Sequence, residues 1–156
     1  SRGFAELRLL AKLRAQGLSV PLPAAARYIR RGPFYTADII TVRIPGIRSL
    51  SDRLTAAEAD THFWQKLGAG ICRFHQAGVF HADLNVSNVQ LDDGDALWLL
   101  DFDRGRLLPP GPWQQRNLAR FHRSLRRLRQ FNPAIYYTEK DWNQFLKGYF
   151  DASRSA

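Results

Sequence analysis

The stretch HADLNVSN, His81 to Asn88, decides how the rest of the chain is interpreted. It places Asp83 and Asn88 five residues apart in a loop between two apolar segments. In LWLLDFDRGR, Asp101 and Asp103 follow directly after a short predicted strand. A loop between rigid elements can hold side chains open to a cleft, and a carboxylate at a strand end can face the same cleft. These residues are therefore the first candidates for a functional site.

The composition predicts one soluble globular domain with an excess of positive charge. The chain has 156 residues, 45% hydrophobic and 24% charged, which is enough for one core. No apolar run reaches the roughly 18 residues of a membrane span, and the first residues lack a signal-peptide pattern, so a cytosolic protein is expected. The lone Cys72 excludes an internal disulfide and is expected to be buried rather than nucleophilic. The net charge of +9 predicts an anionic partner.

The first part of the chain predicts a helix followed by a hairpin. Apolar residues recur at helical spacing from Phe4 to Leu13, and Gly17 is suited to end that helix. Glu6 lies beside the apolar face, where a carboxylate needs a partner. Residues 24–46 are rich in β-branched and aromatic residues around an Arg-Gly-Pro turn, which predicts two paired strands.

The second part predicts three helices and another hairpin. Thr55 and Glu58 have capping-box spacing and predict the start of a long buried helix that ends near Gly78. Residues 92–95 predict a hairpin turn, although such an acidic cluster can also bind a metal. Thr138 begins a last helix. The helix before it carries an apolar stripe beside an arginine stripe, which consists of Arg116, Arg120, Arg123 and Arg127.

The arginine stripe has two interpretations. A row of charges at helical spacing is usually the solvated face of a helix. The alternative is a surface for acidic lipids or for substrate phosphates, to which basic residues are attracted.

The candidate site residues fit phosphoryl transfer. That chemistry needs a carboxylate to orient the attacking hydroxyl and hard oxygen ligands to hold Mg²⁺ between the phosphates of ATP. Asp83 can supply the carboxylate, and Asn88 and Asp101 can supply the ligands. The segment DLNVSN also meets the catalytic-loop spacing D-L-x-x-x-N.

On these motifs the chain resembles the protein-kinase-like fold, with HADLNVSN in place of H-R-D-L-x-x-x-N and Asp101-Phe102 in place of Asp-Phe-Gly. It is more narrowly similar to the lipopolysaccharide kinase family, within it to the 3-deoxy-D-manno-octulosonic acid (Kdo) kinases, in ADIITVRIPGIRSL, FHQAGVFHADLN and LWLLDFDRGR. The resemblance covers nearly the whole chain. It implies an α+β fold, with a partial N-lobe of one helix and a two-strand hairpin in residues 1–46 and a mainly helical C-lobe in residues 47–156.

The resemblance also implies roles. Asp83 would orient or deprotonate the acceptor hydroxyl, while Asn88 and Asp101 would bind Mg²⁺. Glu6 would pair with the lysine that binds ATP, unless it is only an exposed helix charge. His81 is expected to brace the loop as a buried, satisfied histidine rather than to transfer a proton.

Two departures from the kinase pattern matter. Asp103 replaces the Gly of Asp-Phe-Gly, so a flipping activation segment is not expected, and Asp103 is expected to pair with Arg104 or Arg106 rather than to assist the metal. No Gly-rich loop and no strand with a nucleotide-binding lysine precedes Glu6. The chain is therefore expected to lack the strands that cover the phosphates and to be poorly active alone.

The implied function is ATP-dependent phosphorylation of a Kdo hydroxyl on a lipid A precursor, by a peripheral enzyme at the cytoplasmic face of a bacterial inner membrane. The expected partners are this Kdo-lipid A precursor and an anionic membrane surface. Alternatives are a kinase acting on a heptose, a small molecule or a protein, and an inactive kinase-like binding module. Nucleic acid is not expected, because the arginine stripe has no exposed aromatic beside it for base stacking. No stable protein partner is implied.

Overall fold

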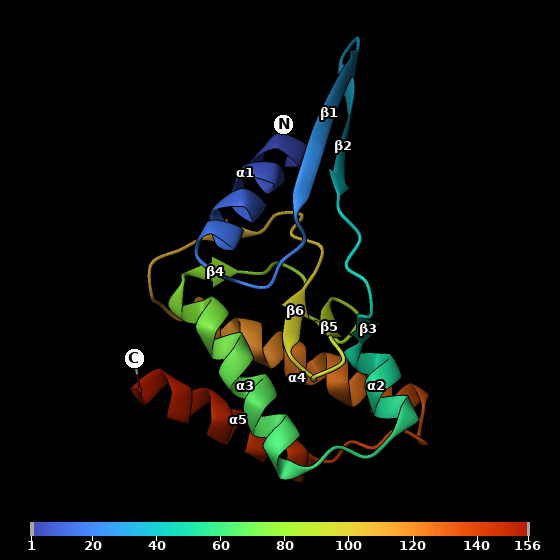
Figure 1. Ribbon diagram of the computed structural model, residues 1–156, viewed down its shortest axis with the longest axis vertical. Helices are drawn as coiled ribbons and strands as arrows, with labels where there is room; N and C mark the ends of the chain where they lie inside the picture. Colours follow the sequence, from blue (N-terminus) through green and yellow to red (C-terminus); the bar gives the residue numbers. More distant parts are fainter. Residues whose placement is uncertain (1, 156) are drawn as a thin grey trace.

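The computed structural model describes residues 2–155 and shows an α+β chain, as predicted. A helix and a long hairpin form one end of the molecule, and the remaining helices form the other, with short strands between them (Figure 1). In chain order the elements are α1 (Arg2–Ala15), β1 (Pro23–Arg31), β2 (Phe34–Thr41), β3 (Arg48–Ser49), α2 (Leu50–Ala56), α3 (Thr61–Gln76), β4 (Val79–Phe80), β5 (Val89–Leu91), β6 (Leu97–Leu99), β7 (Arg106–Leu107), α4 (Trp113–Phe131) and α5 (Glu139–Arg154).

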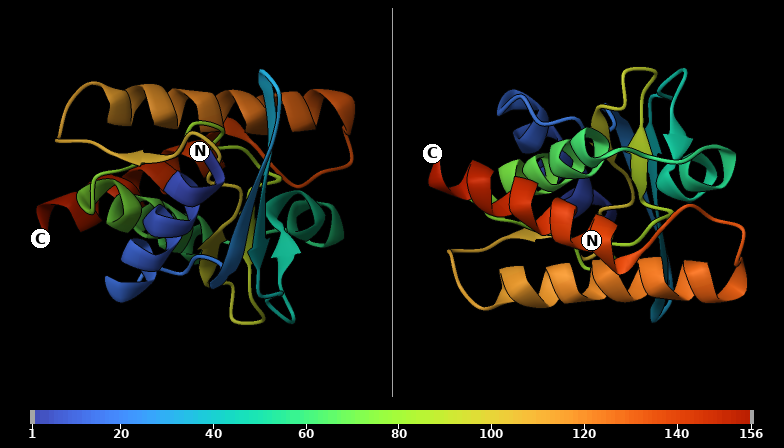
Figure 2. Two further views of the ribbon diagram at one scale, coloured as in Figure 1. Left: turned by 90° about the horizontal axis from the view of Figure 1, so that it is seen from above. Right: turned by 90° about the horizontal axis from the view of Figure 1, so that it is seen from below.

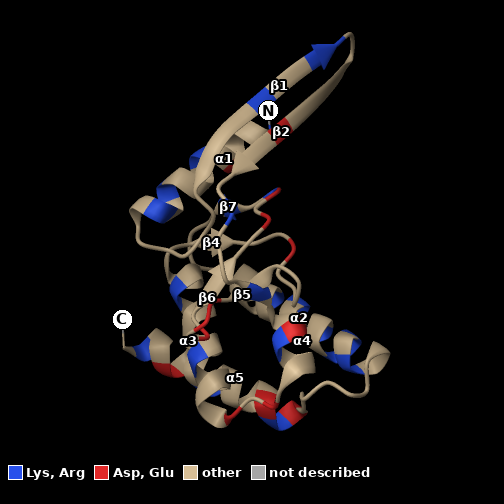
Figure 3. Cartoon of the chain, turned by 45° about the vertical axis from the view of Figure 1, so that its right-hand side comes forward, with Lys and Arg blue, Asp and Glu red and all other residues tan. Residues whose placement is uncertain are grey.

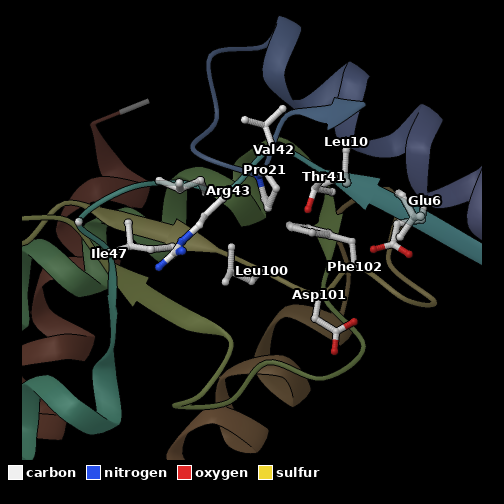
Figure 4. A pocket seen from close by; sticks show the side chains of 13 residues that line it. Glu6, Leu10, Pro21, Thr41, Val42, Arg43, Ile47, Leu100, Asp101 and Phe102 are labelled. Carbon is white, nitrogen blue, oxygen red and sulfur yellow. The ribbon is translucent and has the colours of Figure 1, made fainter. Parts of the chain in front are cut away.

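The first helix and the hairpin form where the sequence predicts them. Helix α1 buries Leu10 and Leu13 and is followed by Gly17, whose φ of +76° suits a left-handed helix end. Strands β1 and β2 pair antiparallel up to Arg31 opposite Phe34, with the predicted turn between them. The helix lies along one side of the hairpin and holds Glu6 near the base of the two strands (Figures 1 and 4).

The predicted capping box at Thr55 is wrong. Thr55 lies inside the short helix α2, where its hydroxyl donates a hydrogen bond of 2.9 Å to the carbonyl of Ser51. Helix α3 begins later, capped by Asp60, whose carboxylate accepts from the N–H of Phe63 at 2.8 Å. The cap of α3 therefore lies five residues after the predicted one, because Thr55 belongs to the separate helix α2, which buries Leu54.

Helices α3 and α5 cross so closely that two glycines are required. A Cβ at Gly68 would collide with the carbonyl oxygen of Phe145, and one at Gly148 would collide with that of Gln65. The crossing is visible from below in Figure 2, where α4 runs along the other side of α5. Trp64 and Phe145 are fully buried beside it. The end of α3, which leads into the predicted catalytic loop, is therefore fixed by the last helix of the chain.

Short antiparallel strands flank the loop of Asp83 and the segment of Asp101. β3, β5 and β6 form one sheet, with Val89 opposite Leu99, while β4 pairs with β7. The β5–β6 connection is the predicted turn, because the Asp92 carboxylate accepts from the N–H groups of Gly94 and Ala96, both at 2.9 Å. Across residues 2–155 no group of three or more His, Cys, Asp or Glu side chains is placed to hold a metal ion.

Candidate active site

His81 is a buried brace, as predicted. Only 1% of its surface is exposed, and burial lowers the pKa of its imidazole. Its Nε2–H donates to the carbonyl of Leu100 at 2.8 Å, so its Nδ1 is left to accept the N–H of Asp83 at 3.2 Å. The ring also packs edge-on against Phe102, with centroids 4.9 Å apart. A neutral His81 therefore ties the loop of Asp83 to the segment of Asp101.

Asn88 completes this connection. The side-chain amide of Asn88 donates to the backbone carbonyl of Asp83 at 2.9 Å. The backbone carbonyl of Asn88 accepts the N–H of Leu100 at 3.0 Å. These hydrogen bonds join the loop of Asp83 and Asn88 to Leu100, the residue before Asp101. Because the Asn88 Nδ2 is used, its Oδ1 is the end left for a ligand.

Asp101 adopts a left-handed backbone conformation, which is uncommon outside glycine although aspartate takes it more often than most residues do. Its φ is +60°, in the left-handed region, and its carboxylate is exposed. The Asp101 Oδ1 accepts only a long hydrogen bond of 3.4 Å from the N–H of Asp103. Strained backbone of this kind concentrates at functional sites. The strain at Asp101 presents a carboxylate at the mouth of a pocket that also contains Glu6 (Figure 4).

The expected pairing of Asp103 is wrong. Asp103 is exposed, and no ion pair joins it to an arginine within residues 2–155. Arg106 instead lies over the ring of Phe80, with its guanidinium carbon 5.3 Å from the centroid. The negative charge of the Asp103 carboxylate is close enough to Glu6 to raise the pKa of the Glu6 carboxyl.

Glu6 is half-buried, which favours a buried partner over the alternative of an exposed helix charge. Burial raises the pKa of its carboxyl, a hydrogen bond with the Phe102 backbone lowers it, and the negative charges of Asp101 and Asp103 raise it further. Within residues 2–155 no basic side chain forms an ion pair with Glu6. Glu6, Asp101 and Asp103 thus leave local negative charge without a counter-ion among residues 2–155, but the three carboxylates are not placed to hold a metal ion by themselves.

The pocket beside these carboxylates has a volume of about 510 Å³. Apolar walls from Leu10, Ile39 and Ile47 enclose one part of it, and Arg43 also lines it (Figure 4). In the figure Glu6 and Asp101 lie at one end, with Arg43 and Ile47 at the other. A partly apolar chamber with carboxylates at one end and an arginine at the other has the size and character of a cofactor or nucleotide site. We refer to it as the nucleotide pocket.

The residues present fit a magnesium ion. Mg²⁺ prefers oxygen ligands and is often held by one or two protein groups together with substrate phosphates and water. The Asn88 Oδ1 and the Asp101 carboxylate supply that donor type, and the excess of negative charge at Glu6, Asp101 and Asp103 favours a cation.

Asp83 faces a different cavity. Its carboxylate is exposed and lies 3.4 Å from the guanidinium of Arg120 on α4, with side-chain exposures of 56% and 49%. This ion pair could not be predicted from the sequence, because the two residues are 37 positions apart. Neither residue lines the nucleotide pocket.

A chain of buried polar side chains supports the loop from below, and sequence reasoning missed it. The Asn117 amide donates to the His81 carbonyl at 2.8 Å, which turns its Oδ1 toward His75 Nε2 at 3.2 Å. His75 Nδ1 then accepts the hydroxyl of Tyr149 at 2.8 Å. Burial lowers the pKa of His75 to about 4 and raises that of Tyr149 to about 12, so both are neutral at pH 7. The signal was a polar residue, Asn117, on the apolar side of α4.

Two further findings concern the rest of the chain. Cys72 is buried, as predicted, and burial raises the pKa of its thiol, which disfavours the nucleophilic thiolate. None of the helices described is both long and apolar enough to cross a bilayer.

Comparison with known proteins gives a consistent result. Residues 1–149 match the model of the lipopolysaccharide kinase (Kdo/WaaP) family. The chain is 43% identical over 150 residues to the 3-deoxy-D-manno-octulosonic acid kinases of Xanthomonas campestris pv. campestris (strain B100) and Stenotrophomonas maltophilia (strain K279a). It is 45% identical over 152 residues to that of Xylella fastidiosa (strain M12). Each match covers 96% of this chain and 59% of the relative. The chain belongs to the lipopolysaccharide kinase family.

Proposed function

We propose that the protein transfers the γ-phosphoryl group of ATP to a hydroxyl of Kdo on a lipid A precursor. The observation that carries this proposal is the set of hydrogen bonds of His81 and Asn88, which joins the loop of Asp83 to Leu100 beside Asp101, together with the pocket of about 510 Å³ that Asp101 lines. Family membership and the names of the relatives support the sugar assignment.

In this reaction the acceptor oxygen forms a bond to the γ-phosphorus as the bond to the β-phosphate oxygen breaks, and ADP leaves. Asp83 orients the hydroxyl and takes its proton. Asn88 and Asp101 would hold Mg²⁺, whose charge neutralises the phosphate oxygens. Glu6 would pair with a lysine that binds the ATP phosphates. No lysine of residues 2–155 lines the nucleotide pocket.

The two parts of the chain would have different roles in this reaction. Residues 1–46 would form part of a nucleotide-binding N-lobe, and residues 47–156 would form the C-lobe with the catalytic loop. The net charge of +9 supports a peripheral position at the anionic cytoplasmic face of a bacterial inner membrane, where the glycolipid acceptor would be met.

The test is phosphoryl transfer by the product of the complete gene. It is incubated with Mg²⁺, γ-labelled ATP and either a Kdo-lipid A precursor or the same precursor without Kdo, and the product is located by mass spectrometry. We expect label on Kdo only, and none with Asp83→Asn. Label on a heptose or on protein, or none with any acceptor, would contradict the proposed function.

A further inference from the structure

The arginine stripe is not uniform. Arg120, Arg123 and Arg127 line a cavity of about 710 Å³ together with Asp83, whereas Arg116 does not. We call this cavity the arginine groove. It lies between the catalytic loop and α4, a helix along which Figure 3 shows repeated basic residues. It shares no lining residue with the nucleotide pocket.

The charge of the arginine groove is strongly one-sided. Of its lining residues three are arginines and only Asp83 is acidic. Arg120 is paired with Asp83, but Arg123 has no ion-pair partner among residues 2–155. Exposed arginines that gather in one concave site favour carboxylates and phosphates, which they bind through paired N–H donors.

The groove also has a direction. Arg120, next to Asp83, and Arg127 are seven residues apart in α4, which is about 10 Å along a helix. Beyond Arg127 lies Phe131, 74% exposed, with the Arg127 guanidinium carbon 5.6 Å from its ring centroid. The expectation that no exposed aromatic lies beside the arginine stripe is therefore wrong. The groove therefore begins at the catalytic carboxylate, continues along guanidinium groups and ends at an apolar surface.

The geometry points to an acceptor-binding function for the arginine groove: it binds oxyanions of the acceptor, and Arg120 binds the one nearest the reacting hydroxyl. This assignment rests on the function proposed above, in which Asp83 accepts the proton. Arg120 contacts the Asp83 carboxylate at 3.4 Å. An acceptor carboxylate or phosphate beside the hydroxyl would draw Arg120 away and leave the Asp83 oxygen free. A neutral acceptor could not make this exchange, so the groove selects acidic sugars.

The experiment combines variants with modified acceptors, using the product of the complete gene. Initial rates are measured for the Kdo-lipid A precursor, for its Kdo methyl ester and for a precursor without the lipid A phosphates. Wild type is compared with Arg120→Gln, Arg127→Gln and the matched control Arg116→Gln, which lies on the same helix outside the groove. Unfolding temperatures confirm that these exposed substitutions leave the fold intact.

We expect Arg120→Gln to lower kcat/KM for the intact acceptor roughly 10- to 100-fold, as for the loss of a charged hydrogen bond. Esterification of the Kdo carboxylate should lower the kcat/KM of the wild type by a similar factor. It should lower the kcat/KM of Arg120→Gln little, because the ester and the substitution remove the same interaction. Removal of the lipid A phosphates should likewise lower the kcat/KM of the wild type and lower that of Arg127→Gln little. Arg116→Gln should stay within about twofold of wild type.

The outcomes separate the alternatives. A wild type that does not phosphorylate Kdo refutes the proposed function itself. Kdo phosphorylation with purely additive effects for both modified acceptors refutes the groove assignment alone. Flotation with phosphatidylglycerol vesicles that lack acceptor provides the last comparison: if the groove variants lose vesicle binding and the rate effects are additive, the arginines bind the bilayer and the assignment is overturned.

Discussion

The side-chain amide of Asn117 on α4 donates a hydrogen bond of 2.8 Å to the carbonyl oxygen of His81, two residues before Asp83. The catalytic loop is thereby attached to the same helix that carries Arg120. The attachment is directional, because the Asn117 Oδ1 is held by His75, which is held in turn by Tyr149. The position of the loop that carries Asp83 and one wall of the arginine groove therefore both depend on α4.

Asn117→Leu should lower kcat about tenfold while leaving the Kd for Mg²⁺-nucleotide unchanged. The substitution leaves the His81 carbonyl and the His75 N–H without partners, at a cost to the free energy of unfolding of about 1–3 kcal/mol. Asn117→Asp, similar in size, keeps an acceptor for the His75 N–H but loses the donor to the His81 carbonyl, so it should also lower kcat. Asn143→Leu, on the exposed face of α5, is the control. Full activity of Asn117→Asp would show that only the size of the residue matters.

Asp83→Ala and Asp101→Asn should fail differently in the product of the complete gene. Loss of the group that orients the hydroxyl should depress kcat while nucleotide binding survives. Loss of a metal ligand should weaken Mg²⁺-nucleotide binding as well. Calorimetry with a non-hydrolysable nucleotide separates the two, with Asp93→Asn in the exposed β5–β6 turn as control. Equal losses of nucleotide affinity would mean that the two roles are misassigned.

Acid should destabilise the protein through His75. Its pKa falls from 6.5 to about 4 on folding, so between these values the unfolded chain binds a proton that the folded chain does not. The free energy of unfolding therefore decreases as pH falls from about 6.5 to about 4, by roughly 3 kcal/mol in all. Urea titrations at several pH values should show a shallower slope for His75→Gln. His62→Gln, at an exposed histidine, is the control and should keep the wild-type slope. An unchanged slope in His75→Gln would show that His75 is not the source of the pH dependence.

Gly148→Ala should be among the most destabilising single-methyl changes in the chain. The added Cβ meets the backbone of Gln65, which cannot rotate away as a side chain could. We expect a loss of about 2–3 kcal/mol in the free energy of unfolding. Gly111→Ala, whose Cβ would meet nothing closer than 3.6 Å, is the control and should change stability little. Similar denaturation midpoints for both variants would contradict the close crossing.

Residues 1–156 alone should not turn over ATP at an appreciable rate. Positioning of the transferring phosphoryl group supplies several kcal/mol of barrier lowering, and none of residues 2–155 places a lysine in the nucleotide pocket to provide it. ADP release measured with a Kdo-lipid acceptor checks this, with the product of the complete gene as the positive control. Robust phosphorylation by the 156-residue chain would refute the expectation.

The sequence was most informative where the chemistry requires a fixed spacing. The interval from Asp83 to Asn88 and the strand before Asp101 predicted which segments lie together, and the side chains of His81 and Asn88 join these segments in the structure. The hairpin turn at residues 32–33 and the cap at Thr138 were likewise local.

The rest depended on contacts between distant residues. The sequence pattern predicted a cap at Thr55, but this residue lies within α2 and Asp60 caps α3 instead. Asp103 has arginine neighbours in sequence, but its exposed position gives it no reason to pair with them. The Arg120–Asp83 pair and the His75–Asn117 link join segments 37 and 42 positions apart, which no local pattern reveals.

The left-handed backbone of Asp101 has a consequence for the evolution of the protein. A glycine would adopt a φ of +60° without strain, so Asp101→Gly is a substitution by which the folded state could gain stability. It would also remove the carboxylate at the mouth of the nucleotide pocket. Selection for heat resistance alone would thus favour the glycine, whereas selection for the proposed reaction would retain the aspartate.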